Sequence, residues 1–391
     1  MRRLIKWLIG IIILVILAWL GVWLYAEMRL KQLVTLEIDQ INASGTQHLT
    51  YSKLATSSSP LVAGITLLNP HLEVILDTTT PPLTANAARI GAYIDIWSPL
   101  TLHIDMPLKV ILGNPAEIGV LTFASADITE TLTSSVLLGN TQNPVAAGNA
   151  QFTGIDLLAS NGSLPVAHID SLTTQEIVNA QANKNQTALA ATNDIKNFSL
   201  SPLFTRMLSL PFNGTISHLS SFFAVSGPLN WEQIAQQSAK LQNDDQREQF
   251  LLKKTHEWAE AGGHAQGNLN LWVGPTHLLS DFTLGFDPQV QPEGKANVTA
   301  NHIGQFINAL IAAYPNLQDW ATEAQNLLSP YLSTTAQNGQ VLAIHLNYGQ
   351  TGVFVNGQKT EDMPFLDWNN LLNTTPPPAF APGDGSGAAS Q

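Results

Sequence analysis

An uncharged run near the N-terminus limits the structures open to this chain more than any other feature. The 19 residues 7–25 contain no charged side chain, and twelve of them are Leu, Ile or Val. As an α-helix this run would be about 28 Å long, close to the roughly 30 Å hydrocarbon core of a bilayer. The sequence therefore predicts one transmembrane helix, with residues 1–26 forming a short cytoplasmic start and the anchor.

The alternative interpretation is a cleaved signal peptide, which has an apolar core of about 7–15 residues followed by small residues at the cleavage site. The run here is longer, and the bulky Trp23 and Tyr25 stand where such a site would follow. We therefore expect the segment to stay in the mature protein. Trp7 begins the run and Trp19, Trp23 and Tyr25 lie towards its end, and aromatic side chains of this kind favour membrane–water interfaces.

The charges that flank the run predict its orientation. Arg2, Arg3 and Lys6 precede it, whereas residues 27–31 carry a net charge of only +1. Because cationic flanks stay in the cytoplasm, the N-terminus is expected inside and the rest of the chain outside. No second hydrophobic run of similar length follows. The sequence thus predicts a single-pass protein of a bacterial inner membrane, with its main domain in the periplasm.

The residues beyond the run are acidic and contain no cysteine. Without the three N-terminal cations, 14 Lys and Arg stand against 29 Asp and Glu, a net charge of −15. Such a domain is repelled by nucleic acid and by anionic lipid surfaces, so no nucleic-acid partner is expected. A chain without cysteine has neither disulfides nor thiol chemistry. Its stability must come from packing and hydrogen bonds.

Periodicity predicts a β-rich α+β fold after the anchor. Residues 27–45 indicate a juxtamembrane helix that lies on the first strands, because apolar side chains recur at spacings of three and four. From 46 to 372, short alternating segments separated by turn residues predict a long, curved, mostly antiparallel sheet with helices packed on it. Residues 373–391 have the Pro, Gly, Ala and Ser content typical of a disordered tail.

Two helical blocks interrupt the strands, at about 230–261 and 301–333. Asn230 and Gln233 have the spacing of a capping box at the start of the first block, and the polar residues 243–245 are a candidate break within it. We expect this block to pack on the sheet through four apolar side chains: Ile234, Leu241, Phe250 and Leu251.

One of the cleanest alternations lies in residues 341–348. One face of this predicted strand carries Leu342, Ile344, Leu346 and Tyr348, and the other carries Ala343, His345 and Asn347. The apolar face is expected to line whatever the sheet encloses. An open groove and a sealed core both require this pattern, so the sequence leaves the two alternatives open.

The sequence contains no recognisable catalytic or cofactor-binding motif. A G-x-S-x-G elbow, a P-loop, a dinucleotide fingerprint and an EF-hand loop are all missing. We therefore assign no catalytic residue, no cofactor and no metal ligand, and we expect a protein that is not an enzyme. His256 and Glu260 share a helical face, and His264 could add a third metal ligand. An ordinary surface i, i+4 pair explains the same residues and is favoured.

Four short segments carry a resemblance to a known family. They are 51–53 (YSK), 64–70 (GITLLNP), 96–99 (IWSP) and 352–357 (GVFVNG). With the N-terminal anchor, they resemble the Gram-negative family known as domain of unknown function 2125, over most of residues 1–360. One departure is the segment 64–66, where a proline would be expected close to the glycine. That family is distantly similar to AsmA-type periplasmic proteins of the envelope. The resemblance implies a curled sheet with an open apolar groove, and it supplies no catalytic residue.

Three functions are compatible with these observations. The first is a non-enzymatic protein of envelope maintenance or assembly, anchored in the bilayer, that binds lipid or another apolar ligand in a curled sheet. The second is a periplasmic scaffold with a closed core, which recruits envelope proteins without a small ligand. The third is an unrecognised hydrolase. An open groove would favour the first, a sealed core the second, and a cleft with clustered carboxylates or histidines the third.

Overall fold

The structure is a computed structural model that describes residues 2–43, 45–57, 59, 61–75, 80–95, 97–114, 116–137, 145–159, 162–241, 243–335 and 339–373. Side chains of residues 2–16, 18, 114, 137, 232, 239 and 373 are not described. Much of the predicted span 7–25 therefore lies outside the described side chains, with Arg2, Arg3, Lys6 and Trp7, as does the predicted tail beyond 373. Among the residues that are described, no helix has the length and apolar character needed to cross a membrane.

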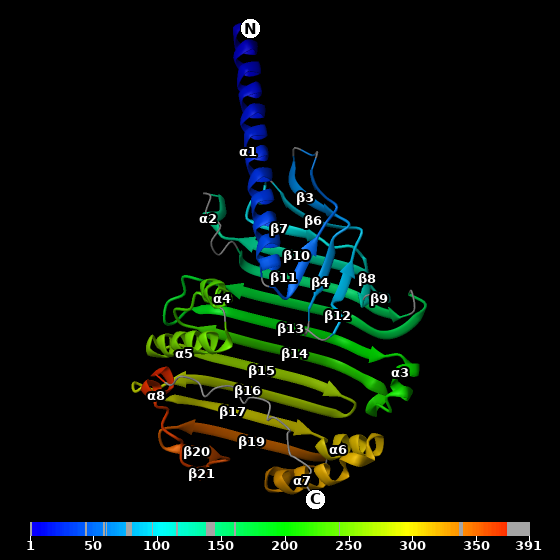
Figure 1. Cartoon of the computed structure of the whole chain (residues 1–391), viewed down its shortest axis with the longest axis vertical. Coiled ribbons are helices and arrows are strands. Elements are labelled where there is room, and N and C mark those ends of the chain that lie inside the picture. Colours follow the sequence, from blue (N-terminus) through cyan, green and yellow to red (C-terminus); the bar gives the residue numbers. More distant parts are fainter. Residues whose placement is uncertain are drawn as a thin grey trace, which may run out of the picture.

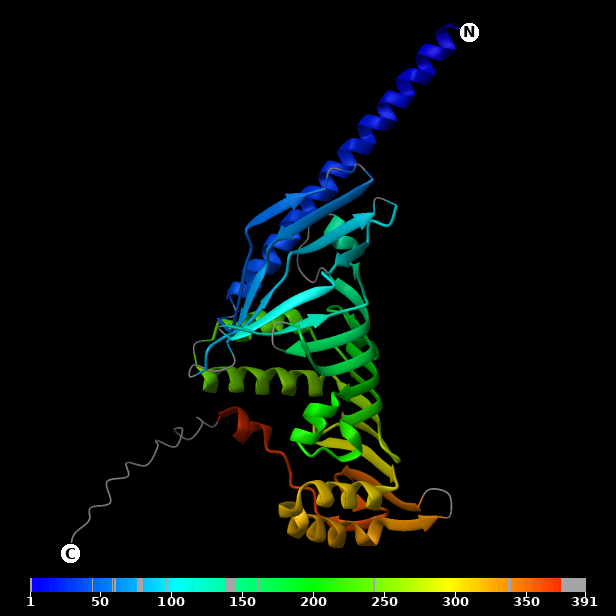
Figure 2. The same ribbon diagram turned by 90° about the vertical axis from the view of Figure 1, so that its right-hand side faces the viewer.

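The N-terminal helix α1 (Arg2–Ala43) has two different environments. Its first half projects away from the body, and its second half lies along the first strands (Figures 1 and 2). Leu30 is fully buried there and Ile38 is nearly so. The predicted juxtamembrane segment 27–45 thus continues the same helix as far as Ala43 and packs on the sheet. The indole Nε1 of Trp23 donates a hydrogen bond to the carbonyl oxygen of Val62 at 3.2 Å. This contact marks the level at which the helix reaches the body.

Within the described residues, 21 strands form one antiparallel sheet, which confirms the predicted fold class apart from the anchor. Its first section consists of β2 (Lys53–Thr56), β3 (Val62–Leu68), β6 (Arg89–Asp95), β7 (Thr101–Asp105) and β10 (Ser125–Leu132). The sheet continues through β11 (Val145–Ala159), β12 (Leu164–Val178), β13 (Thr187–Leu200), β14 (Thr215–Ser226), β15 (His264–Val273), β16 (Thr276–Phe286) and β17 (Pro292–Asn301). It ends with β19 (Gly339–Gly349), β20 (Gly352–Val355) and β21 (Gln358–Glu361), and β18 (Leu332–Thr335) pairs beside β20 on the outer edge of β19.

A second arm of the sheet branches from β11. The first part of β11 pairs with β10, whereas residues 156–159 pair with β9 (Ala116–Thr122). From β9 the arm continues through β8 (Lys109–Asn114), β5 (Leu83–Asn86), β4 (His71–Val74) and β1 (Gln47–Thr50). The two arms approach α1 from two sides, because β3 contacts the helix in one arm and β1 contacts it in the other.

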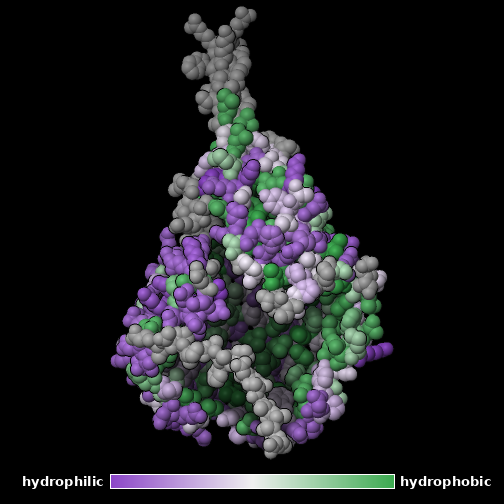
Figure 3. All heavy atoms as spheres, in the orientation of Figure 1, coloured by the Kyte–Doolittle hydropathy of each residue, from purple (hydrophilic) through white to green (hydrophobic). Residues whose placement is uncertain are grey.

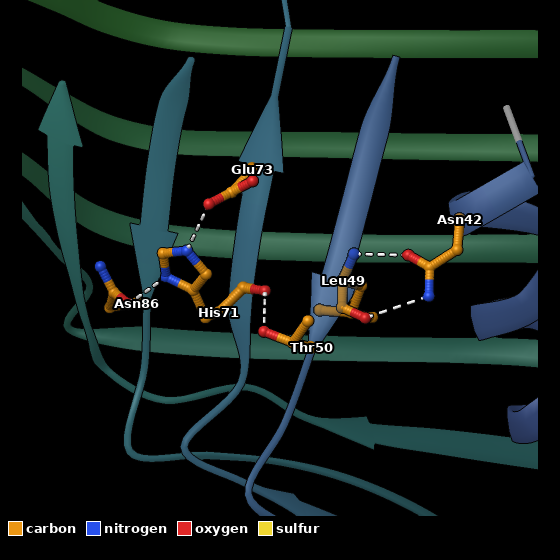
Figure 4. Close-up of polar contacts among 6 residues, drawn as sticks. All are labelled: Asn42, Leu49, Thr50, His71, Glu73 and Asn86. Carbon is orange, nitrogen blue, oxygen red and sulfur yellow. Dashed lines mark hydrogen bonds and ion pairs between the residues drawn. The ribbon is translucent and has the colours of Figure 1, made fainter. Parts of the chain in front are cut away.

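A side-chain amide joins α1 to the second arm (Figure 4). The Nδ2 group of Asn42 donates to the carbonyl oxygen of Leu49 at 3.2 Å, and the backbone N–H of Leu49 donates to Asn42 Oδ1 at 2.6 Å. Asn42 thus takes the place of a neighbouring strand on the free edge of β1, while β4 occupies the other edge. Figure 4 also shows His71 of β4 between Asn86 and Glu73, with its ring nitrogens 2.6 Å and 3.1 Å from their side-chain oxygens.

The main core cluster lies between α1 and the first section of the sheet. It consists of Leu30, Ile65, Ile94, Leu132 and Val136, the last from the short helix α2 (Ser134–Leu137). We call the sheet face that α1 covers the inner face. Register extends this face across the strands, since Ile65 pairs with Ala92 and Ala92 pairs with Ile104.

The remaining helices stand at the two ends of the long strands, on the inner side of the sheet (Figures 1 and 2). At one end lie α4 (Trp231–Ala239), α5 (Asp244–Glu260) and α8 (Trp368–Asn373). At the other end lie α3 (Pro202–Met207), α6 (Ile303–Ala313) and α7 (Gln318–Leu328), joined to their neighbours by the short 3₁₀ helices η1 (Pro211–Gly214), η2 (Pro315–Leu317) and η3 (Ser329–Tyr331).

The first predicted helical block is two helices, separated at the polar segment that the sequence indicated. Each begins with an asparagine cap, because Asn230 Oδ1 accepts from the N–H of Gln233 at 3.0 Å and Asn243 Oδ1 accepts from that of Gln246 at 2.7 Å. Ile234 is buried as predicted, but Leu251 is 42 % exposed. The prediction for Leu251 was wrong because three successive apolar residues, 250–252, cannot all face the same side of a helix.

Candidate functional site: an open apolar groove

The inner face continues without interruption past α1 into the long strands. One row of paired residues begins at the core residue Ile65 and ends at Ile344 of β19, passing through Ile128 of β10 and Leu269 of β15. The neighbouring rows are mainly apolar. We call the part from β12 to β19 the groove, and its large side chains are Leu172, Ile195, Leu219, Phe223, Leu269, Leu271, Leu278, Phe282, Val298, Ile344 and Leu346.

No described element covers the middle of the groove. Phe223 is 42 % exposed and Phe282 is 36 % exposed. Their rings lie 6.3 Å apart on one row, with Gly267 of β15 between them. Figure 3 looks into this hollow, and its floor is largely hydrophobic. Apolar surface left in water lacks the stabilisation of about 25 cal/mol per Å² that burial would give. Large exposed apolar patches usually mark binding surfaces. The face therefore has the character of a binding surface.

Tryptophans close one end of the groove. The ring of Trp258 in α5 packs edge-on against Phe286, with ring centroids 5.7 Å apart, and its Nε1 donates to the carbonyl oxygen of Ser226 at 2.8 Å. Gly263 lies directly against the indole, where any Cβ would collide with it. Trp368 of α8 is buried beside this wall. Because Trp258 bonds to the end of β14 and Trp368 Nε1 donates to the carbonyl oxygen of Val290 in the β16–β17 turn, the wall is fixed relative to the floor.

The opposite end is closed by α3, η1 and α6. Phe212 stacks with Phe306 at 6.1 Å, and Gly274 leaves room for the Phe212 ring. The hydroxyl of Tyr314 donates to the carbonyl oxygen of Leu208 at 2.8 Å, which ties α6 to the end of α3. Three apolar side chains on this rim are about half exposed or more: Leu203, Met207 and Leu208.

The strand count gives the size of the groove. Six inter-strand spacings separate β12 from β19, which at about 4.8 Å each makes about 29 Å. Strands of ten residues are about 33 Å long, and the helices at both ends shorten the open width. Half of a hydrocarbon core is about 15 Å, so the groove is long enough for a lipid chain at full extension.

A short polar row crosses the apolar floor. The hydroxyl of Thr174 donates to Asn193 Oδ1 at 3.1 Å, and Asn193 Nδ2 donates to the hydroxyl of Ser221 at 3.4 Å. These three residues pair across β12, β13 and β14 on the inner face. Binding sites for largely apolar molecules commonly include a few such polar groups, which fix the orientation of the ligand.

Carboxylates lie on the inner face at the end of the groove nearest α1. Glu130 and Glu176 both pair with Gly148, on opposite sides of it. Burial raises the pKa of Glu130, and the charges of Glu176 and of Glu37 on α1 raise it further. This end therefore disfavours additional negative charge.

The outer face of the same strands is more polar, although Ile177, Trp272 and Leu279 are exposed on it. His218 Nε2 lies 2.7 Å from a carboxylate oxygen of Asp194, and His345 Nδ1 lies 2.9 Å from Asn297 Oδ1. A shallow depression of about 480 Å³ on this side is lined by polar side chains that include His264, Gln266, Glu293 and Lys295. The two histidine pairs join neighbouring strands, as expected for a solvated sheet face.

The structure does not assemble the residues considered for a metal site. His256 Nε2 and Glu260 Oε1 are 3.7 Å apart, the surface pair that was favoured. His264 lies on β15 and is exposed. Among the described residues, no three His, Asp or Glu side chains are placed to hold a metal ion.

Two described side chains of the predicted anchor contact the body at the point where α1 leaves it. The ring of Trp19 lies 4.8 Å from that of Trp97, which follows β6. Trp23 bonds to Val62 as described above, and Tyr25 is 42 % exposed. These three residues therefore cluster where the helix emerges.

The sequence analysis predicted the apolar face of one strand of the groove floor, β19, and did not identify the other strands or the polar row. The alternation in residues 341–348 predicts the pairing face of β19, and the structure confirms that Ile344 and Leu346 share it. Similar alternation in β15 and β16 could have identified Leu269 and Phe282. The polar row has no sequence signal, because Thr174, Asn193 and Ser221 are common residues far apart in the chain.

Comparison with known proteins supplies the family. No curated protein matches the chain. One family model, described as an uncharacterized protein conserved in bacteria, matches residues 23–355, well over half of the sequence. The match confirms the resemblance carried by the four short segments, most of which fall inside it. The chain therefore belongs to the DUF2125 family.

Proposed function

We propose that this protein is a non-enzymatic component of the bacterial envelope that is anchored by α1 in the inner membrane and binds a lipid-like molecule in the groove. The observation that carries the proposal is the apolar inner face from β12 to β19, whose middle no described element covers and on which two phenylalanines are partly exposed. A scaffold with a closed core, the alternative raised from the sequence, would have needed a second layer over this face.

The membrane anchor rests on the sequence of α1. The uncharged run 7–25 matches the thickness of a hydrocarbon core, and the flanking cations favour a cytoplasmic N-terminus. The groove and the second half of α1 would then lie in the periplasm. The distant similarity to AsmA-type proteins, implied by the family resemblance, remains a prediction that agrees with this arrangement.

The groove suits an amphipathic ligand better than a purely apolar one. The apolar rows on both sides of the polar row would contact the hydrocarbon part. Asn193 and its two hydroxyl neighbours would bond to a hydroxyl, ester or amide of the ligand. The carboxylates near α1 would disfavour an anionic group at that end. A phospholipid or a related acyl lipid has this chemistry.

Native mass spectrometry of the detergent-extracted full chain tests the proposal. We expect mass additions of one or a few lipids on the wild-type protein. The variant Phe282→Asp places a charge in the groove and should lose these additions. The matched control is Asp281→Asn, the next residue on the same strand, whose side chain faces outward and accepts from Asn297 Nδ2; it should keep them. A lipid-free wild-type protein, or equal binding by both variants, would contradict the proposal.

A further inference from the structure

Two exposed apolar side chains lie on the body beside the point where α1 emerges. Trp97, in the turn between β6 and β7, is 77 % exposed, and Leu61, just before β3, is 54 % exposed. Val62 pairs with Asp95, so the two side chains stand at the same end of the β3–β6 pair. A tryptophan held this far in water is unusual, because its large apolar ring is commonly buried in part.

This tip of the body is fixed to the uncharged run of α1. Trp97 packs on Trp19, with ring centroids 4.8 Å apart, and the backbone of Val62 accepts the indole hydrogen of Trp23. Both helix residues belong to the run 7–25. The depth of this part of α1 in a bilayer therefore sets the depth of Trp97 and Leu61.

The geometry gives that depth. Trp19 lies six residues before Tyr25, about 9 Å along the helix axis from the end of the run. A span placed wholly in the hydrocarbon would carry the β6–β7 turn in with it, where unsatisfied backbone N–H and C=O groups are excluded. When the residues from Trp19 onwards lie at the interface, the rest of the run, 7–18, is about 18 Å long. The bilayer must then thin locally around α1, as it does around other short spans. Tryptophan is enriched at this interface.

We propose that Trp97 and Leu61 insert into the periplasmic interface of the bilayer and form a second attachment point beside α1. This inference rests on the proposed anchor. The attachment is apolar, so it requires no anionic lipid, in keeping with the net charge of −15 beyond the run. A helix and a second contact together prevent free rotation of the body. The α1 end of the groove then faces the membrane at the level of Glu37, about 18 Å along α1 from Tyr25, and the groove extends about 29 Å further.

Spin labels can measure these depths because the natural chain contains no cysteine. Single variants Trp97→Cys, Leu61→Cys, Leu17→Cys and Trp320→Cys of the full chain are labelled and placed in phosphatidylcholine vesicles. Power saturation compares the accessibility of each label to oxygen, which concentrates in lipid, and to a water-soluble nickel chelate. Trp320 is 57 % exposed on α7 at the far end of the sheet and serves as the aqueous control.

We expect the oxygen-to-nickel accessibility ratio to be highest at position 17, intermediate at 97 and 61, and several-fold lower at 320. A lipid-exposed label at 17 together with aqueous labels at 97 and 61 would overturn the second attachment and leave the anchor intact. An aqueous label at 17 would refute the anchor and this inference together. Circular dichroism verifies that each variant is folded, and position 61 provides a second reading of the tip if the Trp97 variant is unstable.

Discussion

The substitution Ile344→Asp separates an open groove from a sealed core. Ile344 lies on the inner face of β19 opposite Val298 and is only partly buried. Full burial of an isoleucine is worth about 1.5–3 kcal/mol, so losing a partly buried one should cost about 1 kcal/mol. The lower strand propensity of aspartate adds up to about 1 kcal/mol. The carboxylate itself can reach water, so we expect a folded protein that is about 1–2 kcal/mol less stable.

The matched control lies two residues earlier on the same face. Leu342 is only 6 % exposed, opposite the fully buried Ala300. Leu342→Asp would bury a charge without a partner, which is heavily penalised, and should prevent folding. Circular dichroism during thermal unfolding, with limited proteolysis, compares the two variants. If Ile344→Asp were as unfolded and protease-sensitive as Leu342→Asp, the open groove would be refuted at this strand.

Three further predictions concern stability. Phe250 of α5 is partly buried, so Phe250→Ala should lower the free energy of unfolding by about 1 kcal/mol. Trp258→Ala also loses a hydrogen bond and should lower it by about 3 kcal/mol. Urea unfolding measures both losses, and equal losses would contradict the role of Trp258 in the wall. Asn42→Ala removes two hydrogen bonds to Leu49 and should cost about 2 kcal/mol, and faster hydrogen exchange should be confined to β1 and the end of α1. Because the pKa of the Glu130 carboxyl is raised in the folded protein, the fold loses stability as the pH rises above the ordinary value of 4.5 and this carboxyl ionises. Glu130→Gln should therefore raise Tm at pH 8 but not at pH 4. An equal change in Tm at both pH values would refute the buried, negatively charged surroundings as the cause.

The sequence predicts local structure well because strand alternation is a local property. The faces of β19, the asparagine at the start of α4 and the helical face of residues 27–45 all follow from neighbouring side chains. The branching of the sheet at β11 does not, since the pairing of its two parts with β10 and β9 depends on residues far apart in the chain. The sequence also does not show whether the groove is open, because the alternation around Phe282 is the same whether or not a second layer covers this side chain.

Site-specific photocrosslinking in growing cells tests directly whether lipid occupies the groove. A photoreactive amino acid is introduced at Phe282, on the groove floor, or at Leu279 of the same strand, which is 43 % exposed on the outer face. Cells are labelled with radioactive phosphate or acetate, irradiated, and the purified protein is analysed for covalently bound lipid. We expect lipid adducts at position 282 and none above background at position 279. The absence of adducts at 282, or adducts of equal yield at both positions, would contradict a lipid-binding groove.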